Sequence, residues 1–194
     1  PQGSILRPLL FSIIIRNLPD VLTHSKYMIF ADDLQLFHHA SPTPDGLKNL
    51  TSQLSHDACS VARWASLNGL TLNPSKTVAI LLGSSAYHSK IDSRSIAPIV
   101  VDGTPIPFVD RLKSLGAIST PKLNWDEHIN HISARVYSAL HSLRFYKHSL
   151  SRELRKQLVE SLIFPHFDYA WAVYNDVTVK QNERLHRLLN ACVR

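Results

Sequence analysis

The chain has 194 residues, of which 44% are hydrophobic and 19% are charged, so it can bury a core and fits one domain or a domain with a small appendage. It has neither a run of 18 apolar residues nor a signal-peptide pattern, which excludes a transmembrane helix, and we expect an intracellular protein. The net charge of +6 is concentrated in the second half, where a polyanionic partner and a solvated helix face would both explain it.

The first predicted element is a helix after the turn-like residues Pro1–Ser4. A loop containing Gly3 before a helix would present free N–H groups to a phosphate or a base, although an ordinary helix cap explains it equally well. Helical spacing predicts one buried stripe, formed by Leu6, Leu9, Leu10, Ile13 and Ile14.

The next segment, "KYMIFADDLQLF" at residues 26–37, places Asp32 and Asp33 between two short, mostly apolar runs in which successive side chains alternate between two faces. This alternation predicts a β-hairpin. Because adjacent carboxylates repel each other and a simple turn favours Asn-Gly or Asp-Gly, the pair suggests a cation site. Mg²⁺ prefers such oxygen ligands, and a solvated acidic turn is the alternative explanation.

A long amphipathic helix over residues 45–68 follows, and Asn68-Gly69 ends it. The next pattern predicts strands at 70–72 and 77–82 around a turn at Asn73-Pro74-Ser75, with Lys76 just beyond the turn. Asp102-Gly103 between apolar residues predicts a second hairpin, and we expect a further strand near residues 112–118.

Beyond Pro121 the pattern becomes helical, with predicted helices near residues 125–143, 154–162 and 185–192. Cys59 and Cys192 fall in helical patterns and are expected to be reduced thiols. His128 and His131 are not assigned as a metal pair, because eleven histidines make such spacing common. Six cations of this region could follow a phosphate backbone, namely Arg135, Arg144, Lys147, Arg152, Arg155 and Lys156.

Four motifs occur in a fixed order: "PQGSILRPLLF", "FADDLQLF", "NGLTLNPSKT" and "VDRLKSLGA". Together they resemble the palm of reverse transcriptases from non-LTR (LINE-type) retrotransposons, particularly the jockey-like kind. The later segments "WDEHINHI", "FPHFDYAWAVYND" and "NERLHRLLNACVR" are similar to the region after the palm in those elements. The resemblance implies an α+β fold with a partial palm over residues 1–120 and a helical thumb over residues 121–194.

The resemblance also implies catalytic roles. Asp32 and Asp33 match the catalytic metal-binding carboxylates of the family, and Lys76 matches the lysine that assists the leaving pyrophosphate. The cofactor implied is a pair of Mg²⁺ ions, with Mn²⁺ as a possible substitute. The implied activity is RNA-directed DNA synthesis by two-metal nucleotidyl transfer to a primer 3′-hydroxyl.

Further residues match positions that contact substrates in the family. Gln2 and Gly3 match the loop against the template base and incoming nucleotide, and Phe30 stands where Tyr is usual. Leu115 and Gly116 match the hairpin that grips the primer end. The implied partners are an RNA template, a DNA primer and a dNTP, with no membrane, and the family implies the nucleus.

The chain also departs from the family pattern. Arg7 stands where Gly is usual, and Pro1 follows the position of a strand that carries a further metal-binding Asp in the family. We therefore expect an N-terminally truncated fragment, with the rest of a polyprotein upstream, that is inactive and prone to associate through an unpaired strand edge. The alternatives are a catalytically dead nucleic-acid-binding remnant and a relic with neither activity.

Overall fold

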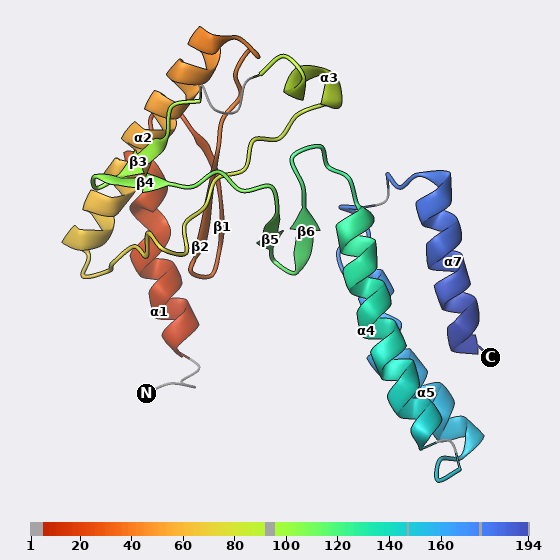
Figure 1. Cartoon of the computed structure of the whole chain (residues 1–194). Helices are drawn as coiled ribbons and strands as arrows, with labels where there is room; N and C mark the ends of the chain where they lie inside the picture. Colours follow the sequence, from red (N-terminus) through yellow and green to blue (C-terminus); the bar gives the residue numbers. More distant parts are fainter. Residues whose placement is uncertain (1–5, 92–95, 147, 175, 194) are drawn as a thin grey trace. The chain divides into compact units, whose positions relative to one another are not determined.

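The computed structural model describes residues 6–91, 96–146, 148–174 and 176–193 (Figure 1). The chain forms two compact units, Pro1–Val109 and Asp110–Arg194. Each unit combines helices with short antiparallel hairpins, which confirms the predicted α+β class. Within the described ranges, no helix is both long and apolar enough to cross a membrane.

The first unit contains three helices, one 3₁₀ helix and two hairpins. In chain order these are α1 (Leu6–Ile14), the 3₁₀ helix η1 (Ile15–Val21), β1 (Lys26–Phe30), β2 (Asp33–Phe37), α2 (Pro44–Leu67), α3 (Ser85–His88), β3 (Ile99–Val101) and β4 (Thr104–Ile106). The predicted hairpins at residues 26–37 and around Asp102-Gly103 are therefore confirmed.

Helix α2 is the element on which the first unit is built. Its start is capped by Thr43, whose hydroxyl oxygen accepts the N–H of Gly46 at 3.1 Å, and Pro44 occupies the first turn, where a missing N–H is harmless. Gly69 has a φ of +69° just after the helix end, a conformation that glycine adopts without strain. The predicted helix and its end at Asn68-Gly69 are confirmed.

Two apolar clusters form against α2. Ile29 and Leu34 of the β1–β2 hairpin pack with Trp64 and its neighbours in one cluster, and Ile99 and Ile106 of the β3–β4 hairpin pack against Ala62 in the other. The two hairpins are thus held through apolar residues of the same helix, since each hairpin needs an apolar partner for its inner face.

Two predictions for the first unit were wrong. The five residues predicted to form a buried stripe in α1 are exposed by 46–61%, namely Leu6, Leu9, Leu10, Ile13 and Ile14, and none of them belongs to the apolar clusters formed by the described residues. Strands at 70–72 and 77–82 are absent, apart from a bridge between Ala79 and Phe108. The predicted turn itself is present, since the Asn73 side chain accepts the backbone N–H and the hydroxyl of Ser75. The flanking residues do not pair with each other, because the N–H of Ala79 donates to the Pro107 carbonyl and its carbonyl accepts the N–H of Val109.

The second unit contains one hairpin and four helices: β5 (Leu112–Ser114), β6 (Ala117–Ser119), α4 (Asp126–Phe145), α5 (Arg152–Leu162), α6 (Pro165–Asp168) and α7 (Val179–Val193). The single strand predicted near 112–118 is a hairpin instead, because Leu115 and Gly116 both adopt positive φ (46° and 83°) and reverse the chain, as a type I′ turn does. The three long helices were predicted correctly.

Helices α4 and α7 lie side by side and share the core of the second unit (Figure 1). Ile129, Val136 and Leu188 are almost fully buried in it. Near the start of both helices, the Gln181 amide donates to the Asp126 carboxylate at 2.8 Å. Hydrogen bonds from Gln181 and Asn124 lower the pKa of the Asp126 carboxyl.

Cys59 and Cys192 are free thiols in helices, as predicted.

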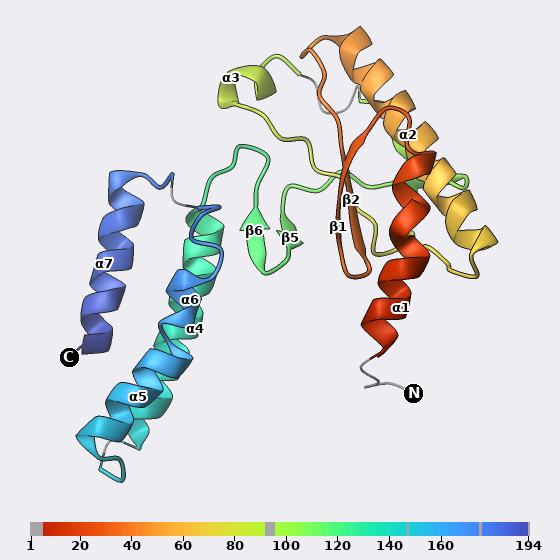
Figure 2. The same ribbon diagram turned by 180° about the vertical axis from the view of Figure 1, so that it is seen from behind.

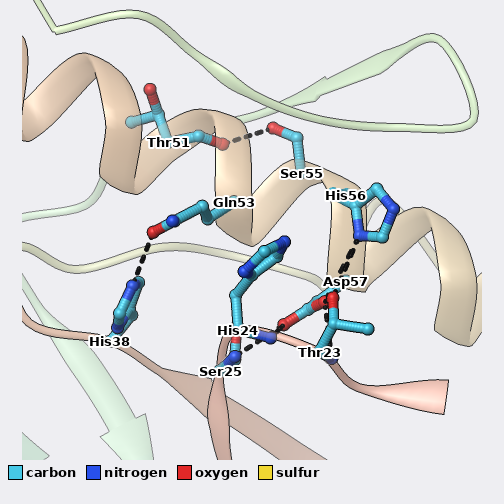
Figure 3. A network of polar contacts seen from close by, with 9 residues as sticks. All are labelled: Thr23, His24, Ser25, His38, Thr51, Gln53, Ser55, His56 and Asp57. Atoms are coloured by element: carbon cyan, nitrogen blue, oxygen red, sulfur yellow. Dashed lines mark hydrogen bonds and ion pairs between the residues drawn. The ribbon is translucent and has the colours of Figure 1, made fainter.

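A buried carboxylate in α2 holds the chain segment that enters β1 (Figure 3). Asp57 has no exposed surface. Its Oδ1 accepts the N–H and the hydroxyl of Thr23 at 3.1 and 3.0 Å, and its Oδ2 accepts the N–H groups of His24 and Ser25 at 3.0 and 2.6 Å. Four donors therefore surround one carboxylate, and no sequence motif predicted this arrangement.

The hydrogen bonds decide the ionisation of Asp57. Burial alone would raise the pKa of this carboxyl, but the donors of Ser25, Thr23 and His24 outweigh burial and hold its pKa well below its usual range. The folded state therefore favours the carboxylate more than the unfolded state does. The resulting stability is present above the unfolded pKa of about 3.9 and is lost as the pH falls toward the lowered folded value.

We predict that Asp57→Ala destabilises the first unit by about 3 kcal/mol, because it leaves several buried donors without an acceptor. The matched control is Asp20→Ala, which removes an exposed carboxylate of η1 and should cost less than about 0.5 kcal/mol. Urea unfolding of both variants and of the parent chain at pH 7 and at pH 3 measures the effect. Equal stabilities for the two variants at pH 7 would contradict the assignment, as would a parent chain no weaker at pH 3.

Candidate active site

The β1–β2 hairpin is closed at one end by a short turn (Figure 2), and the strand register places Asp32 and Asp33 at this closed end. Phe30 and Asp33 form its last paired positions, so Ala31 and Asp32 are the two turn residues. Ala31 has a φ of +52°, which residues other than Gly, Asn and Asp seldom adopt. A first turn residue with positive φ is typical of a type II′ turn, where Gly is preferred.

Asp32 and Asp33 are both exposed to solvent. Beneath the turn, Asp32 and Ala31 border a cavity of about 160 Å³ whose other walls include Phe11, Leu34 and Trp64. This cavity is smaller than the ~300 Å³ from which ligand pockets begin, so it does not hold a nucleotide. The carboxylates therefore stand on an apolar base with their charge available to a ligand at the surface.

Other predicted catalytic residues of the first unit have defined places. Phe30 is 61% exposed beside the turn. Leu70 and Leu72 line the same cavity as Asp32. Lys76 follows them in the sequence and lies in an exposed turn, where its backbone N–H donates to the Asn73 carbonyl at 3.1 Å. Gln2 and Gly3 lie outside the described residues.

A second group of possible metal ligands lies elsewhere in the first unit. His24, His56 and Asp57 place their ligand atoms within 4.8 Å of one another, and they are the one such group of three among the residues that the structure describes. The Asp57 oxygens already accept four hydrogen bonds (Figure 3). We therefore assign Asp57 to support of the chain before β1, and the turn carboxylates to the candidate active site.

In the second unit, Tyr169 covers the Leu115-Gly116 turn. Its hydroxyl donates to the Leu115 carbonyl, and a Cβ added at Gly116 would lie 2.8 Å from the ring. A side chain at position 116 would therefore have to displace this ring, and it would also have to adopt the positive φ of 83°. Sequence analysis missed Tyr169, although it lies in the segment "FPHFDYAWAVYND" that carried part of the resemblance.

Five of the six predicted backbone-binding cations are exposed on helices α4 and α5: Arg135, Arg144, Arg152, Arg155 and Lys156. Lys147 lies outside the described residues. Lys156 is 3.8 Å from the Glu160 carboxylate, an exposed pair that contributes little. Arg135 differs from the others because it borders a cavity together with Gly116.

A family model described as "Reverse transcriptase (RNA-dependent DNA polymerase)" matches residues 1–118. The chain belongs to the reverse transcriptase family. The matched residues include both hairpin turns discussed above, at Asp32 and at Gly116. No solved structure matches this reverse transcriptase chain.

Two curated proteins of Drosophila melanogaster are similar over 99% of the chain. They are "Probable RNA-directed DNA polymerase from transposon BS", at 25% identity, and "Probable RNA-directed DNA polymerase from transposon X-element", at 22% identity. The reverse transcriptase chain covers 22% of the length of each relative. The predicted relationship to polymerases of non-LTR retrotransposons is confirmed.

We predict that Gly116→Ala destabilises its unit more than Gly103→Ala destabilises the other. Both glycines have positive φ at the second position of a two-residue turn (83° and 77°), but only Gly116 has a neighbour within 4 Å of the added methyl group. The backbone change alone costs about 1–2 kcal/mol, and the contact with Tyr169 adds to it. Thermal unfolding of each variant measures the difference, and equal costs would show that Tyr169 does not constrain the turn.

Proposed function

We propose that this chain supplies part of the palm and the thumb of an RNA-directed DNA polymerase, with Asp32 and Asp33 as its metal-binding carboxylates. The observation that carries the proposal is the exposed pair of carboxylates at a closed hairpin turn, inside the residues that match the reverse transcriptase family. On this assignment residues 1–120 are the palm portion and residues 121–194 are the thumb.

The donor set of the turn suits a hard divalent cation. Two carboxylates side by side in sequence, both exposed, offer oxygen ligands of the kind that Mg²⁺ takes together with water and substrate phosphates. When bound, such ions lower the pKa of the primer 3′-hydroxyl and neutralise charge on the triphosphate. We propose Mg²⁺ as the natural ion, and Mn²⁺ as an ion that the same oxygens accept.

The chain's own residues then position the substrates. Asp32 and Asp33 would hold the ions at the hairpin turn, and Lys76, exposed in its own turn, would neutralise the leaving pyrophosphate. The turn at Leu115-Gly116, near the end of the palm portion, holds the primer end, and Tyr169 of the thumb portion covers that turn. The exposed cations of α4 and α5 follow the phosphates of the RNA template and DNA primer.

Primer extension on an RNA template tests this proposal in the longest polypeptide that contains these 194 residues. We predict that Asp32→Asn and Asp33→Asn each lower the extension rate by about 10³-fold, since a lost metal carboxylate removes several kcal/mol of transition-state stabilisation. Asp102→Asn is the matched control, because Asp102 is also exposed in a two-residue hairpin turn.

Extension that persists in Asp32→Asn at the rate of the Asp102→Asn control would refute the catalytic assignment.

The exposed cations of α4 and α5 favour a second candidate function, which is a nucleic-acid-binding remnant without polymerase activity. Its signature is a parent protein that does not extend primers but binds a primer–template duplex with affinity that falls steeply as salt rises.

A further inference from the structure

Three side chains of the kinds that bind metal ions meet where α2 lies beside the segment that leads into β1. His56 and Asp57 are neighbours on α2, and His24 lies two residues before β1 begins at Lys26. One ligand atom from each of the three lies within 4.8 Å of those of the other two. Figure 3 shows both imidazole rings beside the Asp57 carboxylate. Two imidazoles and one carboxylate form a donor set that binds Zn²⁺ in many proteins.

The charge of Asp57 favours a cation at this place. Asp57 is a fully buried carboxylate, and its hydrogen bonds offset the loss of hydration without removing its negative charge. Among the described residues, the one basic side chain within ion-pair distance of it is His56, which is charged only when its ring is protonated. Buried charges in proteins are usually paired with an opposite charge or coordinate a metal ion. Asp57 therefore lacks the permanent positive partner that such a group normally has.

The spacing of the ligand atoms suits a tetrahedral ion. The Nδ1 of His56 lies 3.4 Å from the Oδ1 of Asp57, which is long for a hydrogen bond, since N–H···O distances centre on about 2.9–3.0 Å. Zn²⁺ bonds of about 2.0–2.2 Å place tetrahedral ligands about 3.3–3.5 Å apart. The His56–Asp57 spacing thus already matches one edge of the tetrahedron. His24 is exposed, and a rotation of its ring closes the remaining distance.

Asp57 can bind an ion and still support the chain before β1. Three of its four hydrogen bonds come from the backbone N–H groups of Thr23, His24 and Ser25, and the fourth comes from the Thr23 hydroxyl. Thr23 is exposed, so its hydroxyl can rotate and donate to water instead. The Oδ1 atom then has room for a cation, and the three backbone hydrogen bonds remain.

We propose that His24, His56 and Asp57 bind one Zn²⁺ ion, with a water molecule as its fourth ligand. The ion would join the segment before β1 to α2, in addition to the hydrogen bonds of Asp57. Imidazole ligands favour Zn²⁺, whereas Mg²⁺ and Mn²⁺ favour oxygen ligands, and affinity for a given site is lowest for Mn²⁺ along this series. The site is therefore distinct from the turn at Asp32, and it does not rest on the proposed function.

Calorimetric titration of the 194-residue chain with Zn²⁺ in excess Mg²⁺ tests the site. We expect one tightly bound ion, and His24→Ala and His56→Ala should each weaken its binding at least tenfold, because loss of even an outer-shell partner costs about 10–100-fold. His39→Ala is the matched control, since His39 is an exposed histidine of the same unit outside this group. It and Asp32→Asn should change Zn²⁺ affinity less than about twofold. Circular dichroism checks that each variant folds, and His24→Ala keeps the backbone N–H that Asp57 accepts.

Thermal unfolding gives a second measurement that does not depend on polymerase activity. An ion that binds only the folded state stabilises it, so Zn²⁺ at about 100 times its dissociation constant should raise the midpoint of the first unit by at least about 5 °C. His39→Ala should keep this rise, and His24→Ala and His56→Ala should lose it.

Three results would overturn the Zn²⁺ site. The first is a parent chain that does not bind Zn²⁺. The second is equal weakening by His24→Ala, His56→Ala and His39→Ala, which would show that scattered surface histidines bind the ion. The third is binding that Asp32→Asn removes and His24→Ala leaves intact, which would place the ion at the hairpin turn.

Discussion

The hydrogen bonds to the Asp57 carboxylate are the constraint on which the first unit depends. They join the middle of α2 to Thr23–Ser25, the residues directly before β1 begins at Lys26. Because β1 is five residues long and its two-residue turn follows at once, fixing its start also fixes where Asp32 and Asp33 lie. A buried carboxylate is stable there only because four donors replace its water. The turn that carries Asp32 and Asp33 is therefore positioned by a charge far from it in sequence.

The two functional turns are supported in different ways. The turn at Asp32 packs on apolar residues of α1, η1 and α2. Its backbone strain is the positive φ of Ala31, and the surrounding packing must hold Ala31 in that conformation. The turn at Gly116 has a glycine where φ is positive, and an aromatic ring covers it instead. Both arrangements leave the turn exposed while restricting its motion, which suits residues that must meet a substrate with little reorganisation.

The sequence predicted the elements whose signals are local. The α2 helix has its own N-cap and a glycine at its end, and the Asp102-Gly103 turn has the residues that a type I′ turn requires, so each could be predicted without knowledge of the rest. The turn at Asn73 was predicted too. The strands expected around it were wrong because the backbone of Ala79 bonds to Pro107 and Val109, which lie far from it in sequence. Asp57 and Tyr169 could not be predicted, because their roles come from partners 32 to 54 residues away.

The central claim is that the Asp32-Asp33 turn holds the divalent cation, and paramagnetic broadening by Mn²⁺ tests it most directly. In ¹H–¹⁵N NMR spectra of the chain, the account predicts that Mn²⁺ broadens the amide signals of residues 31–34 first. Excess Mg²⁺ should restore these signals, and Asp32→Asn should remove the effect. Broadening centred on His24 and His56 instead, or broadening at the turn that persists unchanged in Asp32→Asn, would contradict the claim.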